Sequence, residues 1–288
     1  MLEWNENSEE LAFRLVYFSL SAPQLPLYFI ILKAVHNKDS LEPNITFKLI
    51  NLIHLLQIWQ MFGHCVTSPI LIFPRLQSSF AILIRVIGSS MSTCYNEELP
   101  SMALLAVCRV LVFGNVIRTK KTPFGVKAVL LSTFSFLLAL FFYSCFTGLF
   151  VFYSPAWVID PRVPYADTIS QCGLFISILC LVVSYISYII IVYMIYVTKK
   201  DAVSLKSKKN EINIMVQYTI IILYNTVTLV FWHKADIWFD MESVRIRAAI
   251  NVCWIVGAYW NPVLILIFNK FSCSSNASEY VSVFQIGP

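Results

Sequence analysis

The residues that could do chemistry in this chain are few, and they do not form a catalytic group. Glu97 and Glu98 are the only carboxyl residues within a long apolar segment, and all six aspartates lie in short polar segments. The four histidines lack the His-Glu-x-x-His spacing of a zinc-protease helix, and the sequence has no glycine-rich phosphate loop and no Cys-x-x-Cys pair. We therefore expect no enzymatic activity, no metal and no cofactor.

Glu97 and Glu98 are the costliest residues of the chain to bury. Counting about 1.5 Å per helical residue, they lie roughly 17–18 Å from Arg109 and thus near the middle of a bilayer. A charged carboxylate at that depth costs at least a few kcal/mol unless it is hydrogen-bonded or protonated, so we expect it to face the bundle interior. Adjacent helical residues point about 100° apart, so only one of the two can face a central cavity squarely. A ligand contact and a protonated carboxyl satisfied by a neighbouring helix both remain open.

Polar side chains also recur on one face of two other apolar segments. Gln57, Gln60 and His64 have i, i+3, i+7 spacing, and Ser177 and Ser184 are seven residues apart. Such faces either form hydrogen bonds between helices or line a cavity, which the many aromatic residues would make apolar. The candidate ligand-pocket residues are therefore Gln57, Gln60, His64, Glu97, Glu98, Ser177 and Ser184.

Seven long segments with few charges would hold these residues. The uncharged runs are 15–32, 49–74, 128–159, 168–198, 212–233 and 248–269, and the segment 86–108 is interrupted only by the two glutamates. A helix needs roughly 20 apolar residues to cross a hydrocarbon core about 30 Å thick. We expect an all-α membrane protein, a single seven-transmembrane domain with helices over 11–33, 45–71, 84–113, 125–151, 169–198, 211–233 and 245–269. A short tail would follow over 270–288.

The composition agrees with this fold class. The chain is 58% hydrophobic and 13% charged, whereas about 25% of the residues of an average soluble domain are charged. The segment 182–197 is apolar almost throughout, without the two-residue alternation of a membrane β-strand. Both observations argue against a soluble protein and against a β-barrel.

The basic residues predict an orientation with the N-terminus outside and the C-terminus in the cytoplasm. Five Lys or Arg then lie on the outer side, and the first ten residues carry four glutamates and no basic residue. The Lys/Arg excess lies on the inner side, as expected of short cytoplasmic loops. The inner residues are Lys33, Lys38, Lys48, Arg118, Lys120, Lys121, Lys127, Lys199, Lys200, Lys206, Lys208, Lys209 and Lys270. The net charge of +5 therefore predicts contact with anionic membrane lipid and not with nucleic acid.

Three features, in order along the chain, resemble the nematode serpentine chemoreceptors, a branch of the rhodopsin-like G-protein-coupled receptors. The third helix ends in LLAVCR (Leu104–Arg109), and the sixth opens with KKNEI (Lys208–Ile212), followed by Gln217. The seventh ends in NPVLI (Asn261–Ile265), followed by FNK (Phe268–Lys270). The layout agrees over nearly the whole chain, and both the class x and the class t groups of the family fit it.

The chain departs from the family pattern at several positions. Cys108 stands where these receptors carry an acidic or Asn neighbour of the arginine, and Ile265 stands where rhodopsin-like receptors have Tyr. The segment 211–233 contains no proline, which argues against a proline-hinged swing of that helix. The outer cysteine Cys172 has no cysteine near the outer end of the third helix, so we expect no outer disulfide.

The resemblance implies a plasma-membrane receptor, of the kind found in sensory-neuron cilia, that binds a small, mostly apolar ligand from outside and signals through a heterotrimeric G protein. It places an activation switch at Arg109, Asn261 and Pro262. The alternative for Arg109 is that its side chain merely reaches the inner headgroups. The expected G-protein contacts are Arg118, Lys120, Lys121, Lys199, Lys200, Lys206, Lys208 and Lys209.

Three further alternatives remain open from the sequence. The chain could be a transporter or channel for a small solute, although its membrane segments hold few groups for a polar pathway. It could also be a receptor-like protein that no longer signals. Cys273, just beyond the last segment, is either a palmitoylation site or a plain reduced thiol.

Overall fold

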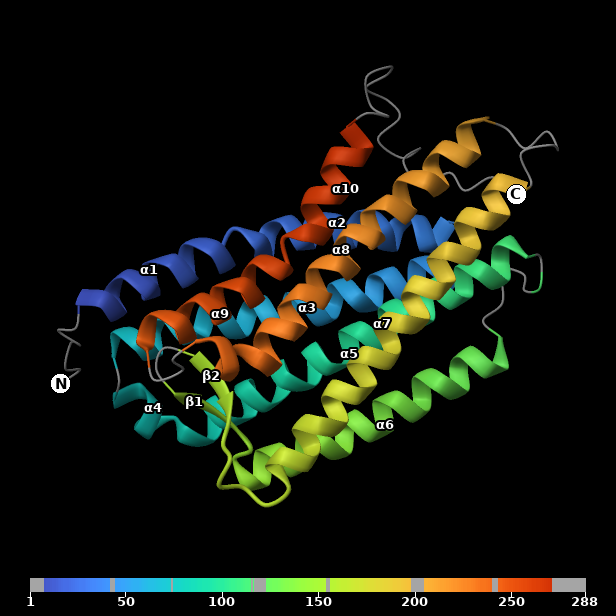
Figure 1. Ribbon diagram of the computed structural model, residues 1–288. Coiled ribbons are helices and arrows are strands. Elements are labelled where there is room, and N and C mark those ends of the chain that lie inside the picture. Colours follow the sequence, from blue (N-terminus) through green and yellow to red (C-terminus); the bar gives the residue numbers. More distant parts are fainter. Residues whose placement is uncertain are drawn as a thin grey trace.

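The structure is a computed structural model that describes residues 8–41, 45–73, 75–114, 116, 123–153, 156–197, 205–239 and 243–270. It consists of helices and one short β-hairpin (Figure 1). The N-terminal half contains α1 (Ser8–Ser21), α2 (Gln24–Leu41), α3 (Ile45–Ile72), α4 (Arg75–Ser79), α5 (Ala81–Phe113) and α6 (Phe124–Thr147). The C-terminal half contains β1 (Phe150–Tyr153), β2 (Ala156–Ile159), α7 (Ala166–Val197), α8 (Leu205–Trp238), α9 (Val244–Gly257) and α10 (Trp260–Lys270).

Five segments of the described chain are long and apolar enough to cross a membrane, and the prediction of an all-α membrane protein is confirmed apart from the hairpin. They are Leu15–Lys33, Ile45–Ile70, Phe124–Thr147, Ala166–Val197 and Met215–Lys234. The third expected span, α5, is less apolar because it carries Arg85, Glu97, Glu98 and Arg109. The seventh expected span is divided into α9 and α10, each of which is short.

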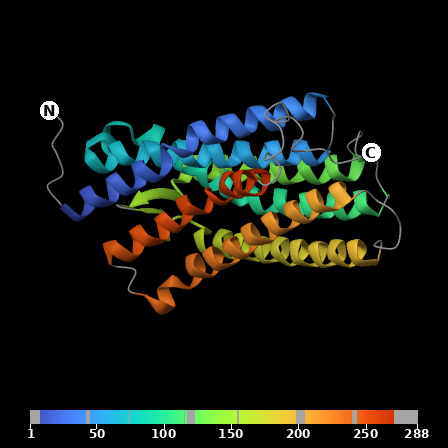
Figure 2. The ribbon, with the colours of Figure 1, turned by 90° about the horizontal axis from the view of Figure 1, so that it is seen from above.

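The helices form an elongated bundle with α5 at its centre (Figures 1 and 2). Helix α5 packs against α3, α6 and α7. Helices α1 and α2 cover α3, while α8 packs between α7 and the α9–α10 pair. Helix α6 packs chiefly against α5 and has at most marginal contact with α7. Only three α6 residues are buried, Val126, Leu137 and Ser144.

Several predicted helix ends are wrong. The first expected helix, 11–33, is interrupted at Ala22 and Pro23, because proline lacks the backbone N–H and disfavours helical geometry in the residue before it. Its second part continues to Leu41, through residues expected to be a loop. Helix α6 ends at Thr147 instead of 151, because Gly148 takes a left-handed φ of 72° and its N–H bonds to the Ser144 carbonyl.

The last two predicted helices also differ. Helix α8 begins at Leu205 and ends at Trp238, so residues 205–210 are helical although a loop was expected there. The final segment breaks at Ala258 and Tyr259, shortly before Asn261 and Pro262. The bend predicted there is confirmed, since the Pro262 ring prevents the normal bond to the carbonyl four residues earlier, that of Ala258.

The unpredicted hairpin caps the end of the bundle where α1 and α9 begin (Figure 1). Its strands pair antiparallel, with Phe150 opposite Ile159 and Phe152 opposite Trp157. The Trp157 indole is 1% exposed, stacks on Phe150 and donates a 3.0 Å hydrogen bond to Thr67 Oγ1. At the hairpin's end, Arg162 donates two hydrogen bonds to the Asp160 carboxylate and so lowers the pKa of that acid.

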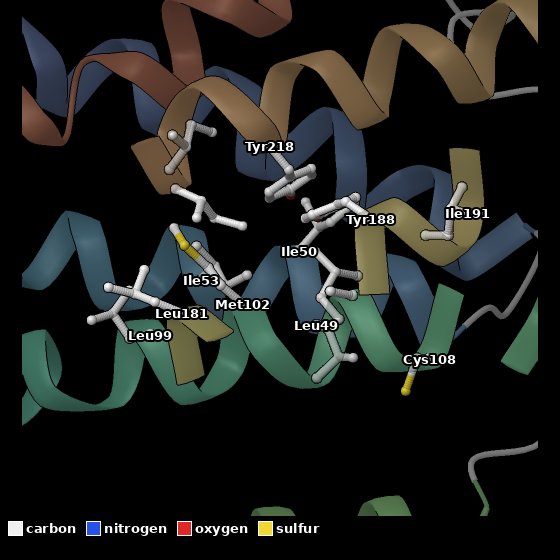
Figure 3. Close-up of a cluster of buried hydrophobic side chains, with 14 of the residues drawn as sticks. Leu49, Ile50, Ile53, Leu99, Met102, Cys108, Leu181, Tyr188, Ile191 and Tyr218 are labelled. Carbon is white, nitrogen blue, oxygen red and sulfur yellow. The ribbon is translucent and has the colours of Figure 1, made fainter. Parts of the chain in front are cut away.

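The opposite half of the bundle has an apolar core of its own. Leu49, Ile50 and Ile53 of α3 pack there against Met102 of α5 and Leu181 of α7 (Figure 3). The same core includes the two tyrosines Tyr188 of α7 and Tyr218 of α8. Helix α5 therefore contributes to a packed core and connects it with the hairpin end.

Candidate ligand and signalling site

The carboxylate of Glu98 is the centre of a buried polar network. Its two oxygens accept hydrogen bonds from α3, one from Gln57 Nε2 at 2.6 Å and one from Gln60 Nε2 at 3.1 Å. The two glutamines are three residues apart and therefore lie on the same face of their helix. Glu98 thus meets a pair of side-chain donors supplied by the neighbouring helix, as a carboxyl group at membrane depth requires.

The far ends of both glutamines are also bonded. Gln60 Oε1 accepts a 2.7 Å bond from the indole N–H of Trp254, and Gln57 Oε1 accepts a 2.8 Å bond from Asn261 Nδ2. An indole nitrogen can only donate, so the oxygen of the Gln60 amide must face Trp254 and its nitrogen must face Glu98. The bond pattern therefore fixes the orientation of this amide.

Tyr28 connects the network to the break in the last segment. Its hydroxyl lies 2.8 Å from Gln57 Oε1 and also within hydrogen-bond distance of the Ala258 carbonyl. That carbonyl is the one that loses its helical partner because of Pro262. We call Tyr28, Gln57, Gln60, Glu98, Trp254 and Asn261 the central network; it joins α2, α3, α5, α9 and α10.

Glu97 and His64 lie outside the central network. Glu97 is 2% exposed and one of its oxygens accepts a 3.2 Å bond from Ser101, one turn further along α5. His64 is fully buried and meets the Trp254 ring edge-on at 4.8 Å, and its nitrogens have no hydrogen-bond partner among the described residues. Of the two adjacent carboxyl groups, Glu98 is the one that faces α3.

Arg109 lies in the core at the other end of α5. Its side chain is only 4% exposed, and its guanidinium carbon lies 5.9 Å from the centre of the Tyr218 ring. Tyr188 and Tyr218 approach each other there from α7 and α8 (Figure 3). A cation over an aromatic face is attracted by the ring's negative quadrupole. Arg109 is thus held inside the bundle, which contradicts the alternative in which it reaches out to the headgroups.

A cavity of about 890 Å³ lies between α5, α6 and α7, towards the hairpin. The α5 residues on its wall include Ser92, Asn96 and Val107. Of the seven candidate pocket residues, Ser177 alone lines it. The other six, Gln57, Gln60, His64, Glu97, Glu98 and Ser184, do not. Ser184 bonds to the Cys180 carbonyl of its own helix.

The cavity wall is mostly apolar, and His233 is the one described residue of its lining with an ionisable imidazole. Within the described residues, its lining includes no Asp, Glu, Lys or Arg. Aromatic and aliphatic side chains such as Phe136, Leu140 and Trp232 alternate with small hydroxyl groups. A wall of this kind suits a small apolar ligand with few polar groups.

No pattern in the sequence distinguished most of these lining residues. Asn96 directly precedes Glu97 and Glu98. The two glutamates were chosen as candidates because they are the only acidic residues of the segment, and Asn96 was not. Gly173 lies on α7 across from Asn96: a Cβ atom at Gly173 would be 3.8 Å from Asn96 Oδ1. The cavity beside Asn96 became visible only in the structure, where α6 packs against α5 and has little contact with α7.

The expected cytoplasmic contacts lie mostly outside the described residues. This holds for Arg118, Lys120, Lys121, Lys199, Lys200 and the candidate palmitoylation site Cys273. Lys206, Lys208 and Lys209 belong to the first turns of α8. Their assignment to a G-protein surface stays a prediction.

Comparison with known proteins gives no family assignment. No protein-family model matches the chain, and no curated protein matches it. Among the described residues, no three His, Cys, Asp or Glu side chains come together as a metal site would require.

Proposed function

We propose that this protein is a seven-helix chemosensory receptor that binds a small, mostly apolar ligand and signals through a heterotrimeric G protein. The cavity between α5, α6 and α7 carries the proposal. Helix α5 is common to the cavity, to the central network and to the group of Arg109, Tyr188 and Tyr218, which we call the Arg109 cluster. A ligand that presses on α5 can therefore act on both groups of buried polar residues.

The arrangement of the helices supports seven crossings with the N-terminus outside. The α1–α2 pair, α3, α5, α6, α7, α8 and the α9–α10 pair alternate in direction along the bundle (Figure 1). The start of α1 and the end of α10 therefore lie towards different ends of the long axis (Figure 1). The first turns of α8, which carry Lys206, Lys208 and Lys209, lie towards the same end as Arg109 in the last turns of α5. The Lys/Arg excess makes that end the cytoplasmic one.

The central network supplies the two-state element that such a receptor needs. Glu98 holds Gln57, and Gln57 holds Asn261 at the break between α9 and α10. If the ligand moves α5, the bond from Gln57 to Glu98 changes and the attachment of α10 changes with it. Helix α10 packs against α8, whose first turns carry Lys206, Lys208 and Lys209 of the proposed G-protein surface. From the resemblance of the sequence to the serpentine chemoreceptors, we propose that the receptor lies in the plasma membrane of sensory-neuron cilia.

Guanine-nucleotide exchange tests the proposal. The purified protein would be reconstituted in lipid nanodiscs with heterotrimeric G proteins, and exchange would be followed with a non-hydrolysable GTP analogue during a screen of small volatile compounds. We expect at least one compound to accelerate exchange with the wild type and not with the cavity-filling variant Gly173→Phe. Solute or ion flux through reconstituted vesicles, without exchange on any G protein, would instead establish a transporter or channel.

A further inference from the structure

Asn96 presents a hydrogen-bond acceptor to the cavity. Its Nδ2 donates a 2.9 Å bond to the backbone carbonyl of Ser92, one turn earlier in α5. A carbonyl can only accept, so the amide orientation is fixed and Oδ1 is the free end. That oxygen lies beside Gly173 at the cavity wall, and no hydrogen bond reaches it from the described residues.

Three other hydroxyl groups of the wall use their donors on the protein. Thr93 Oγ1 donates to the Ser89 carbonyl and Thr133 Oγ1 to the Val129 carbonyl, both at 2.8–2.9 Å. The Tyr143 hydroxyl donates to the Pro164 carbonyl. The serine hydroxyls that remain can either donate or accept. Asn96 and these three hydroxyl groups therefore offer acceptors to a ligand, whereas Tyr95, Trp232 and His233 of the same wall carry groups that can donate.

The cavity communicates with the outer surface of the bundle between α6 and α7. Val129 and Phe136 of α6 line it and are 51% and 54% exposed. Ala139 of α6 and Cys172 of α7 also line it and are exposed. In a membrane, this surface faces lipid and not water. At the other side, Phe150 and Ile159 of the hairpin form part of the wall.

We propose that the cavity takes an uncharged lipophile bearing a hydrogen-bond donor, an alcohol or an aromatic amine, which enters from the bilayer between α6 and α7 and donates to Asn96 Oδ1. The proposal rests on the proposed function in taking this cavity as the ligand site. The bilayer concentrates such compounds next to the opening, whereas a carboxylate or ammonium ion would have to leave water for a wall without a counter-charge.

Asn96 then acts as the residue that determines ligand specificity. A ketone of the same size fills the cavity equally well, but its oxygen can only accept a hydrogen bond. Asn96 Oδ1 is also an acceptor, so it would lose contact with solvent without gaining a hydrogen bond. A neutral hydrogen bond typically contributes a factor of about 5 in affinity. We therefore expect an alcohol to bind about 5-fold more tightly than the matching ketone, once both are corrected for partitioning into lipid.

Competition against a fluorescent probe tests this specificity. Full-length protein in nanodiscs would be titrated with 1-aminoanthracene, an uncharged aromatic amine, and the probe would be displaced with 1-octanol, 2-octanone or octanoate. We expect 1-octanol to compete best and octanoate not to compete. Asn96→Leu should abolish the preference for the alcohol over the ketone, whereas Ser135→Ala, on the lipid-exposed side of α6, should leave it unchanged.

The rate of probe binding tests the entrance. Ala139→Trp adds bulk at the opening on an exposed position, and we expect it to slow association and dissociation together while the affinity changes by less than about 3-fold. An unchanged association rate would overturn entry from the bilayer, and equal affinity for alcohol and ketone would overturn the role of Asn96.

If the probe binds equally well to the wild type and to Gly173→Phe, the cavity is not the ligand site and the proposed function loses its support.

Discussion

The side-chain amide of Asn261 donates a 2.8 Å hydrogen bond to Gln57 Oε1, across 204 positions of sequence. Gln57 in turn donates to Glu98, so the break between α9 and α10 is bonded through one side chain to the carboxylate of α5. Buried polar groups inside a membrane bundle have no water to replace a lost partner. This relationship makes Gln57 the residue whose loss should affect the largest part of the network.

Replacement of Gln57 by Leu should destabilise the protein. The change leaves Asn261 Nδ2 and one Glu98 oxygen without their partners, and each unsatisfied buried group costs about 1–3 kcal/mol. We expect the free energy of unfolding, measured by SDS titration in mixed micelles, to fall by at least about 1 kcal/mol. Trp59→Phe is the matched control on the same helix, since it removes only the exposed bond to Ser90. Equal effects of the two variants would contradict a special role for the network.

Alanine substitutions at two glycines, Gly88 and Gly125, test whether the Trp157 indole packs against α5 as described. A Cβ atom at Gly88 would lie 2.2 Å from Trp157 Cζ3, so Gly88→Ala must displace the indole and weaken its bond to Thr67. Overpacking of this kind typically costs about 1–3 kcal/mol. Gly125→Ala meets open space and should leave stability unchanged or raise it by up to about 1 kcal/mol. Thermal unfolding followed by tryptophan fluorescence would compare the two, and a harmless Gly88→Ala would show that the hairpin is not seated as described.

The Arg109 cluster should control signalling and not ligand binding. We expect Arg109→Leu to reduce ligand-driven nucleotide exchange to background while probe affinity in the cavity stays within about 2-fold. Tyr218→Phe keeps the aromatic face under the guanidinium, whereas Tyr218→Leu removes an interaction worth about 1 kcal/mol, or about 5-fold in coupling. The measurement is nucleotide exchange at saturating ligand. Equal loss in the Phe and Leu variants would point to the tyrosine hydroxyl and contradict the role of the ring.

The sequence was most informative where burial dictates residue type. Long uncharged segments predicted the membrane helices, and the cost of a carboxyl group at membrane depth predicted that one of Glu97 and Glu98 would face the bundle interior, without saying which. The spacing of Gln57 and Gln60 predicted that they would share a face. Pro262 predicted the interruption of the last segment.

Other features depend on how helices pack, which a single sequence does not specify. The cavity exists because α6 packs chiefly on α5, and no residue pattern in 124–147 distinguishes this from an ordinary lipid-facing helix. The hairpin was not predicted because each of its strands has only four residues and Pro155 stands in the sequence between them, which favoured a loop. The helical turn before Glu211 was missed because Lys-rich segments favour both loops and helix ends.

The direct test of the account is the position of the two chain ends relative to the membrane. Epitope tags at the N-terminus and the C-terminus would be probed with antibodies on intact cells and then on permeabilised cells. Seven crossings with the basic loops inside predict that the N-terminal tag is labelled on intact cells and the C-terminal tag only after permeabilisation. Labelling of both tags on intact cells, or of neither, would mean an even number of crossings and would contradict the proposed receptor.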